Sequence, residues 1–456
     1  MSHLLGRVAL FVAVVYVIVL GWGMQELSYD VWGAMVVGPL MIVLTVPLLR
    51  RSLRGEPSWT FPMAFAGLLA KMAGSLVRYW VAFDAYGGAA DAGRYHEFGR
   101  LYAADIRSGR VSLLNFIPSG TGTNFMDRLT ATIYTVFGSS RLAGFLLFGW
   151  LGFWGALWFV RAAMLAIPGL AARRYAALIF FLPSLVYWPS SIGKEAWMCL
   201  CLGLASYGGA RLLAGGNTFG SVVQVALGLT GAAIVRPHLA GMWLAGLAVA
   251  LIAGLFIHRG GDRVRSRVAT LGLLAVALVG LSFVAAFAIR YLEPGTDDVS
   301  VTVSKSIGDI FEETERRSEQ GGSGFETIDL NGPLSWPNAI VRTMTRPLLN
   351  EAGSTAELLP ALEMTSLVLA AVFGWRRFAN IPHMLRKCPY LLFALSIVMM
   401  FGLAFTSIGN LGILTRQRSL ALPLMVIPWC LPPLVARQRT APTASPRPMA
   451  FASTRT

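Results

Sequence analysis

The chain has 456 residues, of which 55% are hydrophobic and 13% are charged. Because a soluble domain of this size does not bury so many apolar residues in one core, the composition predicts a membrane protein. The formal net charge of +15 is spread over short connections between apolar stretches. Membrane topology and anionic lipid headgroups explain this charge, so a nucleic-acid partner is not expected.

Twelve apolar stretches have the character of membrane spans, which need roughly 20 mainly apolar residues. The first stretch has no small-residue cleavage site and the second follows at once, so we expect a retained signal-anchor instead of a removed signal peptide. The sequence therefore predicts an all-α polytopic membrane protein with about twelve transmembrane helices, in one domain over residues 1–436. In chain order the stretches are 8–24, 31–49, 61–83, 142–163, 173–188, 195–213, 218–235, 237–257, 268–290, 358–375, 388–407 and 418–436.

Basic residues fall in alternate connections between these stretches. When the stretches are threaded in order, one face collects the basic connections and has just two acids, Glu56 and Asp262. Because enrichment in Lys and Arg marks the cytoplasmic side, both termini are predicted to be cytoplasmic. The segments 84–141 and 291–357 then become two long extracytoplasmic segments, and the tail 437–456, rich in Pro, Ser, Thr and Ala, is predicted to be disordered. Basic residues of the cytoplasmic face include Arg50, Arg51, Arg54, Arg173, Arg174, Arg259, Arg263, Arg265, Arg267, Arg376, Arg377, Arg386, Lys387, Arg437 and Arg439.

The first outer segment opens with a dense group of polar residues directly after the third stretch. Tyr95, Phe98 and Tyr102 recur at three- and four-residue spacing, which predicts a helix over residues 91–104 lying along the membrane surface. The preceding Gly-Gly-Ala-Ala run lets the chain turn tightly and leaves the Asp91 carboxylate accessible. The alternative is that Asp91 merely caps this helix. The whole group comprises Asp84, Asp91, Arg94, Tyr95, His96, Glu97 and Arg100.

Charged residues also stand at or within other predicted spans. Lys194 and Glu195 follow a Pro- and Gly-containing stretch, 183–193, which predicts a broken helix before the sixth span. Glu195 suits the positive N-terminal end of the next helix, and Lys194 would then point to an anionic group. The alternative is a snorkelling lysine beside a capping glutamate. Lys71 and Arg78 belong to the third span, where charged residues usually face a polar interior.

Arginines stand at two further outer helix ends. Arg236 ends the seventh span shortly before His238, and both Arg416 and Arg418 lie at the start of the last span. Because the planar guanidinium fork matches phosphate oxygens, these residues predict an anion site. A simple anchor to lipid headgroups is the alternative.

The second outer segment is polar and acidic. Residues 302–318 have the spacing of an amphipathic helix, and the Gly-Gly-Ser-Gly run at 321–324 provides a hinge. We expect a lid or a loop that guides an acceptor, with a passive surface loop as the alternative. The four cysteines have no disulfide or metal-binding spacing and are expected to be packing residues.

Three segments resemble the membrane glycosyltransferases of the GT-C superfamily and the related Wzy-type polysaccharide polymerases. They are Asp91-Ala-Gly-Arg-Tyr95-His96, the segment 181–195, and Arg416-Gln-Arg418 before a last span that contains proline. The resemblance implies a polyprenyl-phosphate-linked sugar donor used on the outer side, with a glycan or lipid-linked acceptor and membrane lipids as the other partners. The usual acid of that superfamily follows the first span, whereas Asp91 follows the third. A polymerase that relies on outward arginines tolerates this departure better.

The resemblance also implies roles for the candidate residues. Asp91 would act as the base toward the acceptor hydroxyl, while the cations would hold the donor phosphate and stabilise the charge that grows on the leaving group. One of two outward histidines would bind sugar hydroxyls or phosphate. Without a DxD-like acidic pair, we expect no metal and no other cofactor. The substrate-binding candidates are Arg94, Tyr95, His96, Glu97, Lys194, Glu195, Arg236, His238, Arg416 and Arg418.

Two other classes of function fit the same residues. A transporter or flippase of lipid-linked saccharides would suit the many spans, although the sequence shows no two-fold internal similarity of the kind that transporters often have. A scaffold or assembly subunit of an envelope complex is the third possibility. Convergence of Asp91, Lys194, Arg236 and Arg416 in one outer cavity would favour the enzyme.

Overall fold

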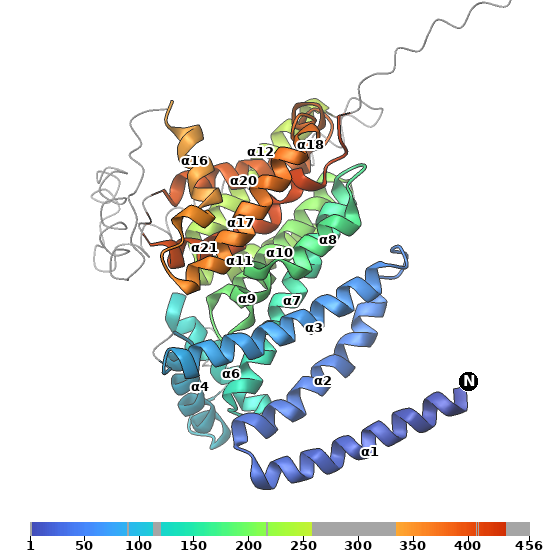
Figure 1. Cartoon of the computed structure of the whole chain (residues 1–456), viewed down its shortest axis with the longest axis vertical. Helices are drawn as coiled ribbons and strands as arrows, with labels where there is room; N and C mark the ends of the chain where they lie inside the picture. The colour runs from blue at the N-terminus through green and yellow to red at the C-terminus, as the bar shows by residue number, and fades with distance from the viewer. Residues whose placement is uncertain are drawn as a thin grey trace, which may run out of the picture.

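The computed structural model describes residues 2–88, 91–112, 120–215, 218–257, 334–406, 408 and 410–434. Within these ranges the regular elements are helices and no β-strand is present, which confirms the all-α prediction. Most of the helices lie side by side in one bundle (Figure 1). The predicted span 268–290, the predicted amphipathic helix 302–318 and the tail 437–456 lie outside the described residues.

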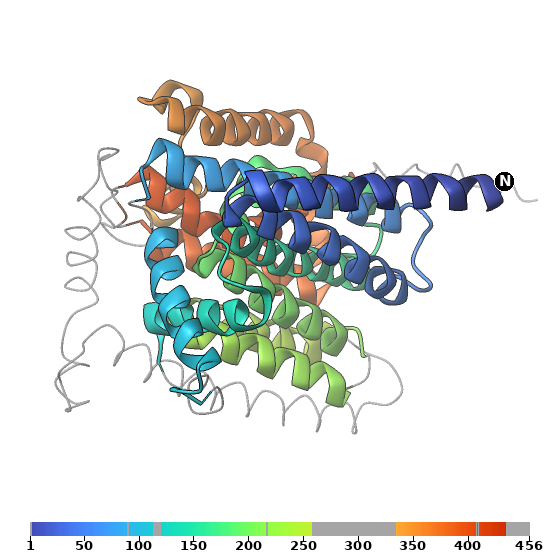
Figure 2. The same ribbon diagram turned by 90° about the horizontal axis from the view of Figure 1, so that it is seen from below.

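Two N-terminal helices form one edge of the bundle. Helix α1 (Ser2–Glu26) contacts α2 (Tyr29–Ser52) through its C-terminal half and extends along the outside of the molecule (Figure 2). Helix α2 packs in turn on α7 (Arg141–Ala166). Arg141 Nε lies 2.6 Å from Asp30 Oδ2, so α2 and α7 begin at the same end of the bundle. Exposed apolar side chains of α1 include Leu10, Phe11, Val17, Ile18 and Trp22.

Helices α7 and α10 (Lys194–Leu213) form the centre of the bundle through backbone contact between glycines. A Cβ atom added at Gly155 would lie 2.2 Å from the Cys199 carbonyl oxygen, and one added at Gly203 would lie 2.3 Å from the Gly155 carbonyl oxygen. No side chain fits in this space, and small residues of this kind allow close helix packing in membranes. Helix α11 (Thr218–Val235) also packs on α10.

One face of α3 (Thr60–Trp80) is shaped to fit a broken helical segment. A Cβ atom at Gly67 would lie 2.5 Å from the Phe180 ring, and one at Gly74 would lie 2.7 Å from the Val186 carbonyl oxygen. The two glycines therefore let this segment lie directly on α3. The segment consists of α8 (Ala172–Phe181), α9 (Pro183–Tyr187) and η2 (Trp188–Ser190).

The predicted span 173–188 is not one helix, because the chain breaks at Leu182. Pro183 has no N–H to continue the α8 hydrogen-bond pattern, and its ring clashes with a continuing helix, but it fits the first turn of α9. The buried Lys71 side chain of α3 donates a hydrogen bond to the Leu185 carbonyl oxygen of this segment. Lys71 therefore supports the broken helix from inside the bundle.

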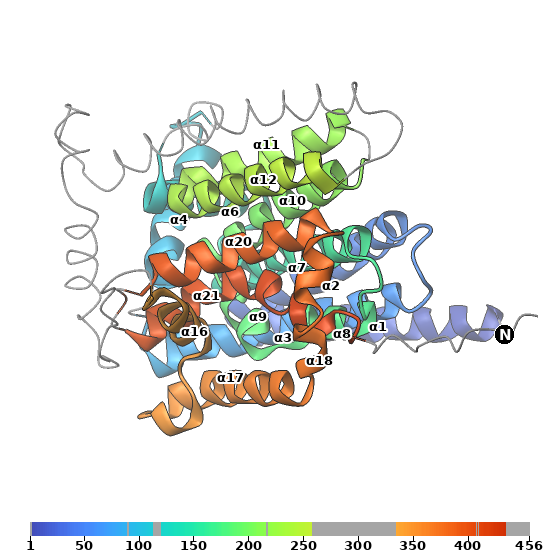
Figure 3. The same cartoon turned by 90° about the horizontal axis from the view of Figure 1, so that it is seen from above.

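The C-terminal half completes the bundle around α10. Helix α12 (Pro237–Ile257) packs on α20 (Pro389–Ala404), α20 packs on α21 (Leu411–Met425), and α17 (Thr355–Phe373) lies at the outside (Figure 3). Helix α17 exposes apolar side chains such as Leu359, Leu369 and Phe373. The other elements are α16 (Trp336–Thr345), η3 (Leu349–Glu351), α18 (Trp375–Phe378), α19 (Ile381–Leu385) and η4 (Ile427–Cys430).

A helical hairpin follows α3 at one end of the bundle (Figure 1). A π-helical turn, η1 (Val81–Ala85), extends α3, and then α4 (Asp91–Arg107) packs against α6 (Gly122–Phe137). A Cβ atom at Gly99 would lie 2.6 Å from the Thr130 side chain, so α4 and α6 approach closely. Helix α4 begins at Asp91, as the sequence predicts.

Five described helices are long and apolar enough to cross a membrane, or six if the pair Glu357–Phe373 and Trp375–Leu385, bent by 75°, counts as one span. The five are Tyr29–Ser52, Thr60–Ala85, Arg141–Ala166, Lys194–Leu213 and Pro237–Gly254. Three further predicted spans correspond to apolar helical segments, Leu10–Glu26 within α1, Phe219–Val235 within α11 and Pro389–Ala404. Within the described ranges, the structure therefore supports a helical membrane protein with five or six helices that could span a membrane, and it does not confirm the predicted count of twelve.

Basic connections gather at the end of the bundle away from the hairpin. The Ala171 N–H donates to the Cys430 carbonyl oxygen at 2.8 Å, and the Leu434 N–H donates to the Arg376 carbonyl oxygen at 2.8 Å. These bonds join the connections after α7, after α17 and after α21.

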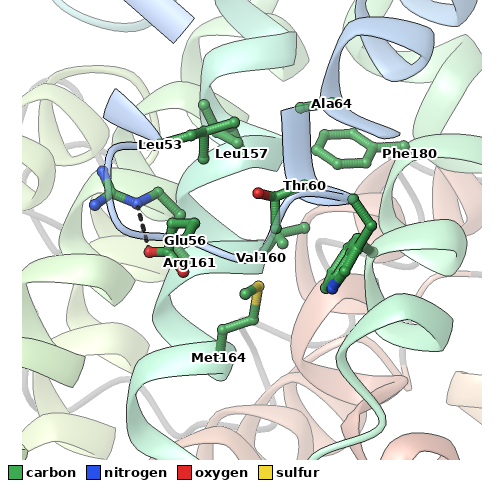
Figure 4. A pocket seen from close by; sticks show the side chains of 11 residues that line it. Leu53, Glu56, Thr60, Ala64, Leu157, Val160, Arg161, Met164 and Phe180 are labelled. Carbon is green, nitrogen blue, oxygen red and sulfur yellow. Dashed lines mark ion pairs between the residues drawn. The ribbon is translucent and has the colours of Figure 1, made fainter. Parts of the chain in front are cut away.

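A small void lies at this basic end, between the connection that follows α2 and the helices α3, α7 and α8 (Figure 4). Arg161 Nε lies 3.8 Å from Glu56 Oε1 beside it. The void measures about 10 Å³, enough for a single water molecule. It is therefore too small to be a substrate site.

Candidate functional site

Four charged side chains from four separate segments meet beside the α4–α6 hairpin. Arg416 connects two carboxylates: its Nη1 lies 2.9 Å from Asp91 Oδ2, and its Nε lies 2.7 Å from Glu195 Oε1. The second contact is a close ion pair without hydrogen-bond alignment. Arg236 Nη2 donates a 2.7 Å hydrogen bond to the same Glu195 oxygen. The network therefore runs in the order Asp91, Arg416, Glu195 and Arg236.

The burial of these side chains increases along the network from Asp91 to Glu195. The Glu195 and Arg236 side chains are 3% and 9% exposed, whereas those of Arg416 and Asp91 are 25% and 58% exposed. A buried carboxylate loses its hydration and needs close cationic partners to remain charged. Glu195 has two such partners, so the network is anchored inside the protein and reaches the surface at Asp91.

Helix ends bring these residues together. Asp91 is the first residue of α4, and Glu195 lies in the first turn of α10, where the helix dipole favours a negative charge. Arg236 occupies the single position between α11 and α12. The Asn410 side chain caps α21 by accepting a backbone hydrogen bond, which places Arg416 in the second turn of that helix.

A cavity of about 270 Å³ lies beside the network. Arg78, near the end of α3, faces it with its guanidinium carbon 4.6 Å from the Tyr187 ring centre and 4.9 Å from the Trp188 ring centre. Its Nη1 donates a 2.7 Å hydrogen bond to the Tyr187 hydroxyl, while its Nε has no hydrogen-bond partner among the described residues. The cavity is lined by Arg78, Ala82, Asp91, Ala92, Ser191, Ile192, Gly193 and Arg416.

Positive charge exceeds negative charge around this cavity. Lys194, the first residue of α10, is half-buried, and its Nζ donates a 3.0 Å hydrogen bond to Thr123 Oγ1 of α6. With Arg78, Arg236 and Arg416 it makes four cations beside the carboxylates of Asp91 and Glu195. An anionic ligand would offset this excess.

Arg418 does not share the cavity with Arg416. Residues two positions apart on an α-helix are separated by about 200° around its axis. The Arg416 and Arg418 side chains therefore point to different sides of α21. The buried Arg418 guanidinium donates hydrogen bonds to the carbonyl oxygens of Met344 and Arg346. It therefore holds the end of α16 against the bundle, and the expected pairing of two arginines in one anion site is not observed.

Tyr95 lies behind Asp91, buried between α4 and the bundle. Desolvation, together with the charges of Asp91 and Glu195, raises the pKa of its hydroxyl. Arg94 is exposed, with its Nη2 3.6 Å from Asp127 Oδ2. Burial raises the pKa of Asp127, and its Oδ1 has no hydrogen-bond partner within the described part of the chain.

Three other predicted site residues lie apart from the cavity lining. His96 Nδ1 is 2.9 Å from the Tyr134 hydroxyl, inside the α4–α6 interface, and burial lowers its pKa to about 4. Glu97 is exposed and forms a 3.0 Å hydrogen bond with Arg100, which lowers its pKa. The His238 ring lies 6.0 Å from the Phe405 ring. Both histidine side chains therefore contact other side chains of the protein, whereas the sequence-based prediction was that one of them contacts sugar or phosphate.

The sequence-based site missed the cavity contact of Arg78 and the positions of Thr123 and Asp127. Arg78 lies on the same face of α3 as Gly67 and Gly74, so the glycine spacing indicated which way its side chain points. Thr123 and Asp127 carry no signal of this kind, because the packing of α6 alone brings them beside α10.

In the described ranges, no three His, Cys, Asp or Glu side chains gather in a way that could hold a metal ion. Comparisons with protein-family models, with curated proteins and with solved structures found no match to this chain. The geometry of the site is therefore the basis for any functional inference.

Proposed function

We propose that this protein is a membrane glycosyltransferase that uses a polyprenyl-phosphate-linked sugar donor on the extracytoplasmic face, in the assembly of a cell-envelope glycan or exopolysaccharide. One observation carries the proposal. The Asp91 carboxylate lies on the same cavity as Arg78 and Arg416, and Arg416 is linked through Glu195 to the buried Arg236. A proton acceptor and several phosphate-binding groups are the parts that glycosyl transfer from a phosphate requires.

In the proposed reaction, Asp91 accepts the proton of the acceptor hydroxyl. The acceptor oxygen forms a bond to the anomeric carbon of the sugar while the bond from that carbon to the phosphate oxygen breaks. Negative charge grows on the leaving polyprenyl phosphate. Arg78 and Arg416, which line the cavity, would stabilise that charge.

The surroundings of the cavity suit a substrate that is anchored in lipid. Leu76, Val77 and Trp80 are exposed on α3 at the same level of the helix as Arg78, although they point to other sides of it. A prenyl chain can therefore remain in the membrane at the depth from which its phosphate reaches the guanidinium. Basic connections gather at the opposite end of the bundle. Because basic connections favour the cytoplasm, we place the cavity on the extracytoplasmic side.

The test is transfer of a radiolabelled sugar from a polyprenyl phosphate to a glycan or lipid-linked acceptor by the purified, full-length protein. Asp91→Asn should abolish transfer. Asp105→Asn is the matched control, because Asp105 lies on the same helix, α4, and pairs with Arg110 at 2.6 Å, away from the cavity. Transfer should survive in this control. Passage of the lipid-linked sugar across a vesicle wall without a new glycosidic bond would indicate a flippase instead.

A further inference from the structure

Arg416 binds two carboxylates whose surroundings differ strongly. Its Nε contacts Glu195, whose side chain is 3% exposed, and its Nη1 contacts Asp91, whose side chain is 58% exposed. Water screens an exposed ion pair, so the contact with Asp91 is the weaker of the two. Separating Arg416 from the buried Glu195 would leave a carboxylate with reduced compensation in the interior, which is costly. Arg416 is therefore anchored at Glu195 and can exchange its second partner.

The charge balance of the network favours such an exchange. A single Glu195 oxygen serves both Arg236 and Arg416, so one buried negative charge faces two positive charges. Asp91 supplies the second negative charge from the cavity side. A ligand phosphate entering the cavity could supply the same charge to Arg416, in competition with Asp91.

We propose that Arg416 holds the Asp91 carboxylate until the phosphate group of a ligand takes its place, so that phosphate binding frees Asp91. This inference rests on the proposed function, because it takes the phosphate to be that of the sugar donor. While Asp91 Oδ2 accepts the hydrogen bond from Arg416, that oxygen is not available to an acceptor hydroxyl. Release from Arg416 makes it available. The donor therefore binds first, and the acceptor hydroxyl is activated afterwards.

The inference predicts that removing the charge of the candidate base strengthens phosphate binding. In Asp91→Asn, a phosphate no longer competes with a carboxylate for Arg416. The affinity for geranyl monophosphate, a short prenyl phosphate, should rise about two- to fivefold, the range expected for an exposed ion pair. The measurement is isothermal titration calorimetry on the full-length protein in detergent. Asp105→Asn removes the same charge from the same helix and should leave the affinity unchanged.

A variant that lacks Arg416 separates the predicted rise in affinity from a change of fold. In Arg416→Gln the affinity for geranyl monophosphate should fall, and adding Asp91→Asn to this variant should then have no further effect on the affinity. Thermal unfolding of each variant reports whether it is folded. Unchanged or weaker binding in Asp91→Asn would overturn the inference, and so would the absence of geranyl monophosphate binding to the unmodified protein.

The outcomes separate this inference from the proposed function. Stronger binding in Asp91→Asn with no detectable sugar transfer by the unmodified protein would keep the exchange at Arg416 and refute the transferase. Loss of transfer in Asp91→Asn without stronger binding would keep the transferase and refute the exchange.

Discussion

Glu195→Gln tests whether one buried carboxylate holds the arginine network together. The Glu195 Oε1 atom lies 2.7 Å from both Arg236 Nη2 and Arg416 Nε, and the side chain is 3% exposed. Glutamine keeps the shape of this side chain but removes the charge at the point where two guanidinium groups meet. Breaking a buried ion pair by removing one partner costs about 3 to 5 kcal/mol, so we expect the free energy of unfolding to fall by about 3 kcal/mol or more.

The assay is chemical unfolding in detergent micelles, followed by tryptophan fluorescence. Glu97→Gln is a suitable control, because Glu97 is an exposed acid paired with Arg100 and its loss should cost less than about 1 kcal/mol. Combining Glu195→Gln with Arg236→Met removes one of the uncompensated charges, so part of the lost stability should return. A loss below about 1 kcal/mol in Glu195→Gln, or strictly additive effects in the double variant, would refute this account of the network.

Three further predictions concern packing, the separated arginines and acid stability. Gly203→Ala should lower the free energy of unfolding by about 1 to 3 kcal/mol, because the new Cβ atom would lie 2.3 Å from the Gly155 carbonyl oxygen. Gly209→Ala on the same helix should be tolerated, because its Cβ atom would lie 3.5 Å from the nearest atom, in the Leu247 side chain. Arg418→Met should cost about 1 to 3 kcal/mol by leaving buried carbonyl groups without their donor. Arg416→Met should cost stability as well, because the buried Glu195 loses one of its two cations, and it should also weaken the binding of geranyl monophosphate. Unfolding and calorimetry on both variants compare the two. Burial lowers the pKa of His96 from 6.5 to about 4, so the unfolded chain takes up a proton that the folded protein excludes. The free energy of unfolding should therefore fall by about 2 to 3 kcal/mol as the pH drops from 6.5 to 4. A pH-independent difference between His96→Leu and the unmodified protein would contradict this last prediction.

Helical periodicity made part of the fold accessible from the sequence. The start of α4 at Asp91 and the helices near 31–49 and 142–163 follow from apolar spacing and length, because these are local properties of the chain. The described structure does not confirm the predicted count of twelve spans. Length and composition do not register breaks such as that at Pro183, which divides one predicted span into α8 and α9.

The sequence also identified most of the charged residues that meet at the site. Asp91, Lys194, Arg236 and Arg416 stand at helix ends beside apolar stretches, where an isolated charge is conspicuous. It did not determine which of them bind one another. That depends on the packing of segments far apart in the chain, as in the contact between Arg416 and Asp91.

What the sequence determined by itself is therefore the class of protein and the set of candidate charges. The tertiary structure decided their roles. It turned Arg416 toward the cavity and Arg418 toward the backbone of α16, and it buried Glu195 between two arginines. The physical reason is that apolar spacing is read from neighbouring residues, whereas an ion pair depends on the direction and burial of side chains, which are fixed only when the helices pack.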